Sequence, residues 1–249
     1  MNKIGIGIGE DWEKVISSVI KSGISDQVTL YCKSGVVGSG TGTITHHISP
    51  CPEQDLVTDL MKGTIRAAIR GTLPANATLR ALKQAAGVDH LERIALLETA
   101  GGKKFLLAPV GVDEGWSVAE KVAFVQKGRE IAGKFGLPAR VAILSGGRLG
   151  DLGRNRRVDR SMADAELVAR ITGETHYEIL VEDAISEAGV IIAPDGITGN
   201  LMFRTLTFLG AGHGHGAPVI NIDRIFVDTS RASPDYRNAI MLADSLSKS

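Results

Sequence analysis

Residues 193–204 combine glycine, hydroxyl and charged side chains in the way that anion-binding sites do. They spell APDGITGNLMFR, and an apolar run is followed by Asp195, Thr198, Gly199 and Asn200. Thr198 is placed to cap a helix, and Gly199 lacks a side chain where a ligand oxygen would approach free backbone N–H groups. A capped turn without a ligand explains the same residues, so both interpretations stay open.

A second stretch, 144–161 (LSGGRLGDLGRNRRVDRS), is rich in arginine. It holds Arg148, Arg154, Arg156, Arg157 and Arg160, offset by Asp151 and Asp159. The guanidinium fork donates two parallel hydrogen bonds to a phosphate, so this stretch indicates a phosphate or nucleotide site. A solvated, mobile loop is the alternative.

A third stretch, 228–238 (DTSRASPDYRN), places Ser230 and Arg231 between a strand and a helix. A hydroxyl, a guanidinium and helix N–H groups together form an anion cradle. The alternative is a turn in which Arg231 pairs with Asp228 or Asp235. Elsewhere, Lys62 and Arg66 are four residues apart in a predicted helix, which adds a weaker cationic signal.

Histidines do not indicate a metal centre. The run 212–216 (GHGHG), together with His46, His47 and Cys51, contains no helical His pair at i, i+4 and no CxxC. We therefore expect no metal site and interpret the run as a flexible surface connection. The sequence also has no GxSxG nucleophile motif and no G-x-G-x-x-G motif.

Apolar runs and amphipathic stretches alternate along the chain, which predicts the elements that position these residues. The predicted strands are 3–9, 27–32, 92–98, 103–110, 139–145, 189–194, 217–222 and 224–228. The predicted helices are 11–23, 55–70, 75–87, 117–136, 161–173, 198–210 and one from Pro234 to about 246. Strands separated by helices favour an α/β fold with a mainly parallel sheet, and Gly101-Gly102 predicts a hairpin.

Composition excludes several classes of function. The 249 residues carry 28 Lys plus Arg and 28 Asp plus Glu, so no net charge attracts nucleic acid or an anionic membrane. Aromatic residues make up 4%, too few for base-stacking platforms. No apolar run reaches membrane-spanning length, and the two cysteines form no disulfide framework. We expect a cytoplasmic protein without nucleic-acid or membrane partners.

Several segments resemble, in order, the phosphate acetyltransferase/butyryltransferase family over about residues 55–246. They are LMKGTIRAA, FLLAPVGVDEGWSVAEKVAFVQKGREIAGKFGL, ARVAILS, EDAIS, VIIAPDGITGNLMFRTLTFLG and DTSRASPDYRNAIMLAD. Within that superfamily, the short length and the GHGHG run resemble the Mtx subunit X family, also called methanogenesis marker protein 4, which carries a methyltransferase label.

The resemblance implies a two-domain α/β/α sandwich of the isocitrate/isopropylmalate dehydrogenase-like, or phosphotransacylase-like, type. The expected domains are 1–100 plus 222–249 and 101–221, with the active site in the cleft between them and a homodimeric assembly. By position, Ser230 and Arg231 would bind phosphate, with Asp195, Thr198, Gly199, Asn200, Lys62 and Arg148 as further binding residues. The implied partners are a phosphate, an acyl phosphate or a methyl carrier.

The chain departs from the family after Ser230 and Arg231, where acidic residues usually help to deprotonate a thiol. Asp235 is the one nearby carboxylate and hence the candidate catalytic base, while Arg237 stands where an acid is expected. Three functions follow: a phosphotransacylase-like transferase with coenzyme A or a related thiol as co-substrate and no tightly bound cofactor, a methyltransferase subunit, or a non-catalytic binding protein. We favour the first.

Overall fold

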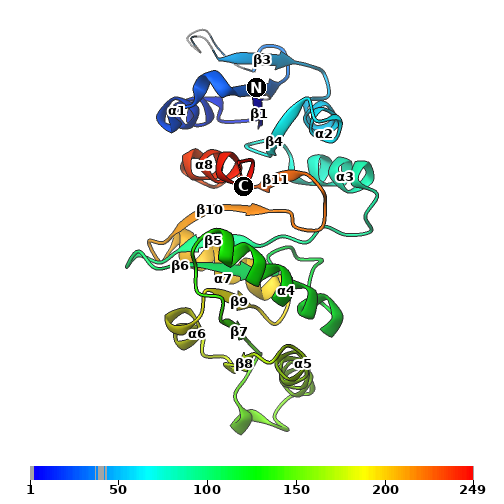
Figure 1. Ribbon diagram of the computed structural model, residues 1–249, viewed down its shortest axis with the longest axis vertical. Coiled ribbons are helices and arrows are strands. Elements are labelled where there is room, and N and C mark those ends of the chain that lie inside the picture. Colours follow the sequence, from blue (N-terminus) through cyan, green and yellow to red (C-terminus); the bar gives the residue numbers. More distant parts are fainter. Residues whose placement is uncertain (1–2, 37, 39–41, 43, 249) are drawn as a thin grey trace. The chain divides into compact units, whose positions relative to one another are not determined.

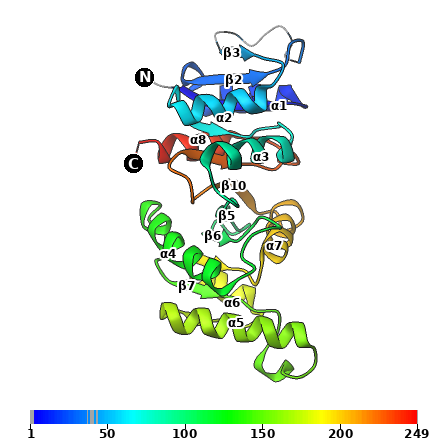
Figure 2. The same ribbon diagram turned by 90° about the vertical axis from the view of Figure 1, so that its right-hand side faces the viewer.

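The computed structural model describes residues 3–36, 38, 42 and 44–248. These divide into two compact units, residues 1–91 with 215–249 and residues 92–214, whose bounds include the undescribed ends. Each unit is an α/β layer structure with its own strands and covering helices (Figures 1 and 2). Each is described separately below as the first and the second unit.

The first unit is built on strands that are parallel except at one edge. In sheet order they are β3 (Thr45–Ile48), β2 (Val28–Cys32), β1 (Lys3–Ile8), β4 (Ile65–Ile69), β11 (Ile225–Asp228) and β10 (His213–Pro218), whose first two residues precede the start of this unit's second segment at His215. β10 runs antiparallel to β11, pairing Ala217 with Asp228. The other pairs are parallel, so β1, β4 and β11 end at the same edge of the sheet.

Helices cover both faces of this sheet. Figure 1 shows α1 (Trp12–Ser22) and α8 (Arg237–Leu246) on one side of the strands, and α2 (Pro52–Lys62) and α3 (Ala75–Ala86) on the other. A core between the strands and α2 includes Tyr31, Leu56, Leu60 and Phe226, all almost completely buried. Burial of such side chains is the main stabilising contribution, at roughly 1.5–3 kcal/mol each.

The second unit repeats this arrangement. Its strands are, in order, β5 (Ala95–Glu98), β6 (Lys104–Ala108), β9 (Val190–Ile192), β7 (Val141–Ile143) and β8 (Thr175–His176). β5 and β6 form the predicted antiparallel hairpin, and the remaining pairs are parallel. Their carboxyl ends therefore share one edge, where ligands of α/β proteins bind.

The helices of the second unit cover both faces of its sheet. α4 (Val118–Lys134) and α5 (Arg156–Thr172) pack against each other over one face. α6 (Val181–Glu187) and α7 (Gly196–Phe208) lead the chain back across the sheet, and right-handed crossovers put them on the other face. Ser117 and Glu120, a pair typical of a helix start in the sequence, form a capping box at the start of α4. Among the described residues, no helix is long and apolar enough to cross a membrane.

The predicted helix over 55–70 is wrong in its second half. α2 ends at Lys62, because Gly63 adopts a left-handed φ of 75° and closes the helix with N–H bonds to Asp59 and Leu60. The following IRAAI becomes the buried central strand β4. Arg66 therefore does not share a helical face with Lys62.

Other predicted bounds also need correction. α5 begins at Arg156 rather than 161, since Asn155 caps it, and α8 begins at Arg237 rather than after Pro234. The GHGHG run enters strand β10 instead of forming a flexible connection. β8 and α6, which no sequence pattern indicated, fill residues 175–187. The Gly-, Ser- and Thr-rich stretch 34–52 is expected from its composition to form a loop, and its residues 37, 39–41 and 43 lie outside the described residues.

The bounds of the compact units also differ from the predicted domain bounds. The prediction puts residues 92–100 in the first domain, yet β5 pairs with β6 along its whole length, so a boundary at 100 would cut a hairpin. The chain passes from the first unit to the second between Leu91 and Glu92, and it returns to the first unit between Gly214 and His215.

Gly71 offers a test of the packing at the carboxyl edge of the first unit. Its φ is 60°, and an added Cβ would lie 2.1 Å from the carbonyl oxygen of Gly7 in β1. We expect Gly71→Ala to cost about 1–2 kcal/mol for the backbone conformation and roughly 1–3 kcal/mol more for the overlap. The free energy of unfolding in urea measures this cost.

Gly87→Ala is the matched control, because Gly87 has a similar φ of 68° but open space around the added Cβ. We expect it to show the conformational cost alone. Equal losses for the two variants would contradict the proposed contact between Gly71 and β1.

Candidate anion-binding site

The second unit contains a pocket of about 980 Å³ at the amino ends of α5 and α7. Four cationic side chains line it, and only two carboxylates, Asp164 and Asp195, oppose them. The cations are Lys121, Arg156, Arg157 and Arg160. All of the lining residues belong to residues 92–214, so this pocket lies within one compact unit. Its charge favours an anionic guest.

The first turns of α5 supply the arginines. The Asn155 Oδ1 accepts from the backbone N of Arg157 at 2.9 Å and so fixes the helix start in the pocket wall. Arg160 pairs with Asp164 one turn later, at 2.8 Å. Within the described part of the chain, Arg156 and Arg157 form no ion pair, which leaves both guanidinium groups available to a ligand. The helix dipole adds positive potential at this end.

Lys121 is the buried cation of the pocket. Its side chain is 7% exposed, and its Nζ lies 3.7 Å from the nearer oxygen of Asp164. Burial lowers the pKa of the Lys121 ammonium below its ordinary value; the carboxylates of Asp164 and Asp195 oppose this effect, and Arg160 adds to it. Lys121 is therefore a buried cation whose ion-pair partner is Asp164.

Asp195, not Thr198, is the cap of α7. The Asp195 Oδ1 accepts hydrogen bonds from the backbone N of Thr198 at 2.8 Å and from its hydroxyl at 3.0 Å. The sequence prediction assigned the cap to Thr198. The helix starts two residues earlier than predicted, at Gly196. Asp195 and Thr198 both line the pocket, and their role in binding stays a prediction.

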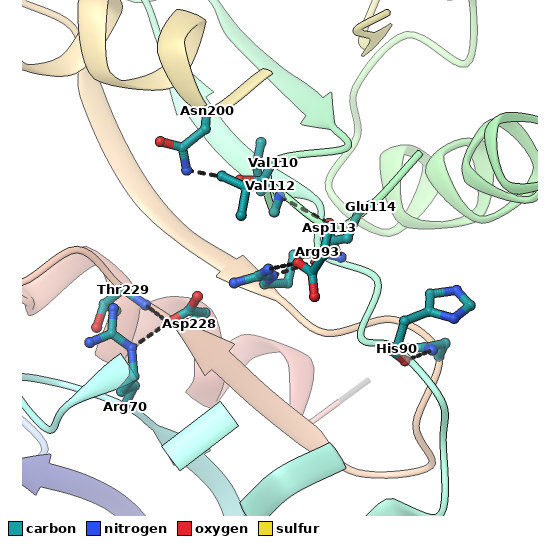
Figure 3. A network of polar contacts seen from close by, with 12 residues as sticks. Arg70, His90, Arg93, Val110, Val112, Asp113, Glu114, Asn200, Asp228 and Thr229 are labelled. Carbon is teal, nitrogen blue, oxygen red and sulfur yellow. Dashed lines mark hydrogen bonds and ion pairs between the residues drawn. The ribbon is translucent and has the colours of Figure 1, made fainter. Parts of the chain in front are cut away.

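Gly199 and Asn200 make packing contacts within the second unit, and their predicted role in binding stays a prediction. A Cβ on Gly199 would lie 1.9 Å from the carbonyl oxygen of Pro109, and one on Gly196 would lie 1.6 Å from that of Gly111. The Asn200 amide donates to the carbonyl of Val110 at 2.9 Å (Figure 3). These residues therefore fasten α7 to the loop that follows β6, and neither Gly199 nor Asn200 lines the pocket.

A buried ion pair holds that loop. The Glu114 side chain is fully buried and accepts from Arg93 Nε at 2.6 Å and from the Gly111 backbone N at 3.1 Å (Figure 3). Burial raises the pKa of Glu114, and the charge and hydrogen bonds of Arg93 oppose this change. The Glu114 carbonyl in turn accepts from Gly196 N at 3.0 Å, so the pair also supports α7.

Ser230 and Arg231 lie in the first unit, at the edge where β1, β4 and β11 end. The Lys14 ammonium donates to the carbonyl of Arg231 at 2.7 Å, and the Tyr236 hydroxyl donates to that of Ser230 at 3.2 Å. Burial raises the pKa of Tyr236 to about 12, with Arg70 and Arg231 acting in the opposite direction. This loop is therefore held through its backbone, and the Arg231 side chain is exposed.

The alternative pairing for Arg231 does not occur with Asp228. That carboxylate pairs with Arg70 Nε at 2.5 Å and accepts from Thr229 N at 2.8 Å (Figure 3). Asp235 is exposed and accepts from the backbone N of Arg237 at 3.1 Å, as a turn residue does. That contact gives Asp235 a local structural role, and its assignment as a catalytic base stays a prediction.

The remaining candidates occupy other positions. Lys62 is exposed at the end of α2, which leads into the amino end of β4, whereas Ser230 and Arg231 follow the carboxyl end of the parallel β11. Arg66 pairs with Asp244 at 2.7 Å inside the first unit. Arg148 is exposed and does not line the pocket. Arg154 pairs with Asp151 at 2.5 Å.

Lys121, Asp164 and Trp116 were missed by the sequence analysis. Lys121 lies on the same face of α4 as the buried Phe124, Val125, Gly128 and Ala132. A lysine on the apolar face of an amphipathic helix was the signal that could have found it. Asp164 and Trp116 gave no comparable pattern.

A second polar cluster resembles a catalytic triad in its distances alone. The Ser145 Oγ lies 2.8 Å from His176 Nε2, and His176 Nδ1 lies 2.7 Å from Glu166. Ser145 is only 2% exposed and donates to the Gly147 carbonyl at 2.9 Å, so it is not available as a nucleophile. The cluster instead orders the loop after β7. No group of three potential ligand side chains suited to a metal ion occurs among the described residues.

Comparisons with known proteins agree with this architecture. The chain is 44% identical to a Methanosarcina barkeri protein named "Putative methyltransferase mtx subunit X", over 98% of this chain and 93% of the relative. It is 52% identical to the Methanosarcina acetivorans protein of the same name, over 79% and 72%. No protein-family model matches the chain.

Solved structures confirm the predicted fold class. A branched-chain phosphotransacylase from Enterococcus faecalis superposes with a TM-score of 0.75 over 99% of both chains. Sequence identity is 17%, so the likeness establishes the shared α/β fold.

Gly199 gives a direct test of its packing role. Gly199→Ala should destabilise the protein by roughly 1–3 kcal/mol, because the added methyl overlaps the Pro109 carbonyl. Gly133→Ala is the matched helical control, since no atom lies within 4 Å of its added Cβ, and alanine there should stabilise by roughly 0.5–1 kcal/mol. Thermal unfolding distinguishes the two, and a neutral Gly199→Ala would contradict the close packing.

Proposed function

Because the chain belongs to the Mtx subunit X family, we propose that it is a transferase that anchors a phosphorylated or coenzyme-like small molecule in the pocket of the second unit. The observation that carries the proposal is that two arginines without an ion-pair partner and one buried lysine line the same pocket. Arg156 and Arg157 supply bidentate donors, and Lys121 supplies a desolvated point charge.

The chemistry of the lining residues supports phosphate binding in this pocket. A dianion would accept hydrogen bonds from both guanidinium groups and would relieve the poorly compensated charge of Lys121. Asp195 is committed to the cap of α7, and Asp164 is shared between Arg160 and Lys121. Neither carboxylate needs to leave its place to admit a phosphate.

The transferred group is a separate question. The relatives' names favour a methyl group, whereas the fold shared with a phosphotransacylase favours an acyl group. Both chemistries use a phosphorylated or coenzyme-like molecule as carrier or acceptor. Ser230 and Arg231 remain a proposed second phosphate contact, in the first unit. A non-catalytic binding protein would retain the pocket without turnover.

Titration calorimetry with inorganic phosphate and acetyl phosphate tests the anchoring role. We expect Arg156→Ala/Arg157→Ala to weaken binding by roughly tenfold or more, since hydrogen bonds to charged groups contribute about 1.5–3 kcal/mol each. Arg154→Ala is the matched control, because Arg154 pairs with Asp151 and does not line the pocket. Equal affinities for the wild type and the double variant would reject the pocket as the anchor.

The same titrations with Arg231→Ala test the second contact, and turnover assays identify the transferred group. Formation of acetyl coenzyme A and phosphate from acetyl phosphate and coenzyme A would support acyl transfer, and transfer of the methyl group from a methylated carrier to a thiol would support methyl transfer. Tight binding without either reaction would favour the non-catalytic alternative over the transferase.

Lys121 predicts an unusual dependence of stability on pH. Its pKa is lower in the folded than in the unfolded chain, so the unfolded state binds the proton more readily between the two pKa values. Stability is full above the unfolded pKa and falls as pH drops toward the folded pKa. Lys121→Met should therefore have a higher melting temperature than the wild type at pH 7, and the difference should vanish at strongly alkaline pH.

Lys121→Arg is the control, because arginine keeps the charge and does not lose it at alkaline pH. It should lack the gain in stability. A Lys121→Met variant that is less stable than the wild type at pH 7 would show that the ion pair with Asp164 outweighs the cost of burial.

A further inference from the structure

Part of the pocket lining is apolar, and phosphate binding gives it no role. Trp116, Pro194 and Ile197 line the cavity together with the cationic side chains. Trp116 is 54% exposed and Ile197 is 46% exposed, although both are large apolar residues. Exposed apolar side chains beside a cationic wall fit a guest that has an apolar part as well as an anionic part.

Trp116 is held in a fixed orientation. Its indole Nε1 donates to the carbonyl of Val112 at 3.1 Å, and its backbone N donates to Glu120 Oε2 at 2.7 Å. The indole N–H is thereby satisfied by the protein, so a ligand would meet the ring as an apolar surface. A fixed aromatic face loses little conformational entropy when another ring stacks on it.

The size of the pocket also favours a guest larger than inorganic phosphate. Its volume of about 980 Å³ lies near the upper limit for sites of drug-sized ligands, which run from about 300 to 1,000 Å³. Inorganic phosphate would leave most of that space and the whole Trp116 wall in contact with water. A larger guest would use both walls at once.

We propose that the ligand of this pocket carries a planar heteroaromatic ring on the same molecule as its phosphate, and that Trp116 selects it by stacking. The inference rests on the proposed phosphate site and names the class of molecule that binds there. The phosphate contacts Arg156 and Arg157, and the ring lies on the indole between Pro194 and Ile197. Nucleotide-like esters are the simplest members of this class.

A matched pair of ligands isolates the ring. AMP and ribose 5-phosphate share the sugar phosphate and differ in the base. Stacking of a base on an aromatic side chain contributes about 1–3 kcal/mol and tolerates any base. We expect AMP to bind roughly tenfold more tightly than ribose 5-phosphate, as measured by calorimetry at constant salt.

Tryptophan fluorescence locates the ring. The chain has two tryptophans, Trp12 in the first unit and Trp116 in the second, so Trp12→Phe leaves Trp116 as the sole indole reporter. AMP should quench this signal, and ribose 5-phosphate should not. Trp116→Ala should remove the preference for AMP, while Trp116→Phe should retain part of it. Because Trp116 is half exposed, we expect its variants to fold, and thermal unfolding of each variant is the check.

The outcomes separate this inference from the proposed function. Equal binding of AMP and ribose 5-phosphate, both weakened by Arg156→Ala/Arg157→Ala, would overturn the ring proposal and leave the phosphate site intact. Binding of neither would reject the phosphate site itself. A Trp116 signal that changes with protein concentration but not with AMP would assign the apolar wall to contact with a second copy of the chain, which also overturns the inference.

Discussion

The pocket of the second unit depends on how closely α7 approaches the loop that follows β6. Two helical glycines, Gly196 and Gly199, allow the backbone to reach the carbonyl oxygens of Gly111 and Pro109 without a side chain between them. The buried Glu114 holds the other side of this contact through Arg93 and Gly111. This packing determines where α7 begins, and hence where Asp195 and Thr198 meet the pocket.

Electrostatics in the pocket follow from this geometry. Asp195 caps its own helix, so hydrogen bonds from the first turn of α7 already stabilise its negative charge in the empty pocket. Asp164 serves two cations, one close and one more distant. The arginines of α5 therefore face the cavity with an excess of positive charge. Cationic side chains that lack a compensating negative charge lower the stability of the ligand-free protein, and such groups are common in binding sites.

Much of the fold could be predicted from the sequence, because apolar periodicity and turn residues act locally. Ser117 with Glu120 marked the start of α4, and Gly101-Gly102 marked the β5–β6 hairpin. The segment 63–69 was assigned wrongly, since its apolar residues fit a helix and a buried strand equally well. Only the position of IRAAI between β1 and β11 decides the matter, and pairing between distant strands leaves no local pattern.

The site was predictable in part for the same reason. Arg156, Arg157 and Arg160 stood out by composition, and Asp195 by its position after a strand. Gly199 was noticed for the right property, the absence of a side chain, but the neighbour that requires it is a carbonyl of the protein. Lys121 is in the pocket only because α4 turns that face inward. Ser230 with Arg231 and Asp235 keep their predicted roles as hypotheses.

The order of segments along the chain has a consequence for biosynthesis. The second unit is continuous in sequence, whereas the first is completed by residues after 214. Its strand β11 lies beside β4 in the sheet, and α8 covers one face of that sheet, yet both come after the second unit in the order of the chain. The edge of β4 that pairs with β11 therefore stays unpaired while the whole second unit is synthesised. During that interval the exposed edge is the part of the nascent chain most open to mispairing or to chaperone capture.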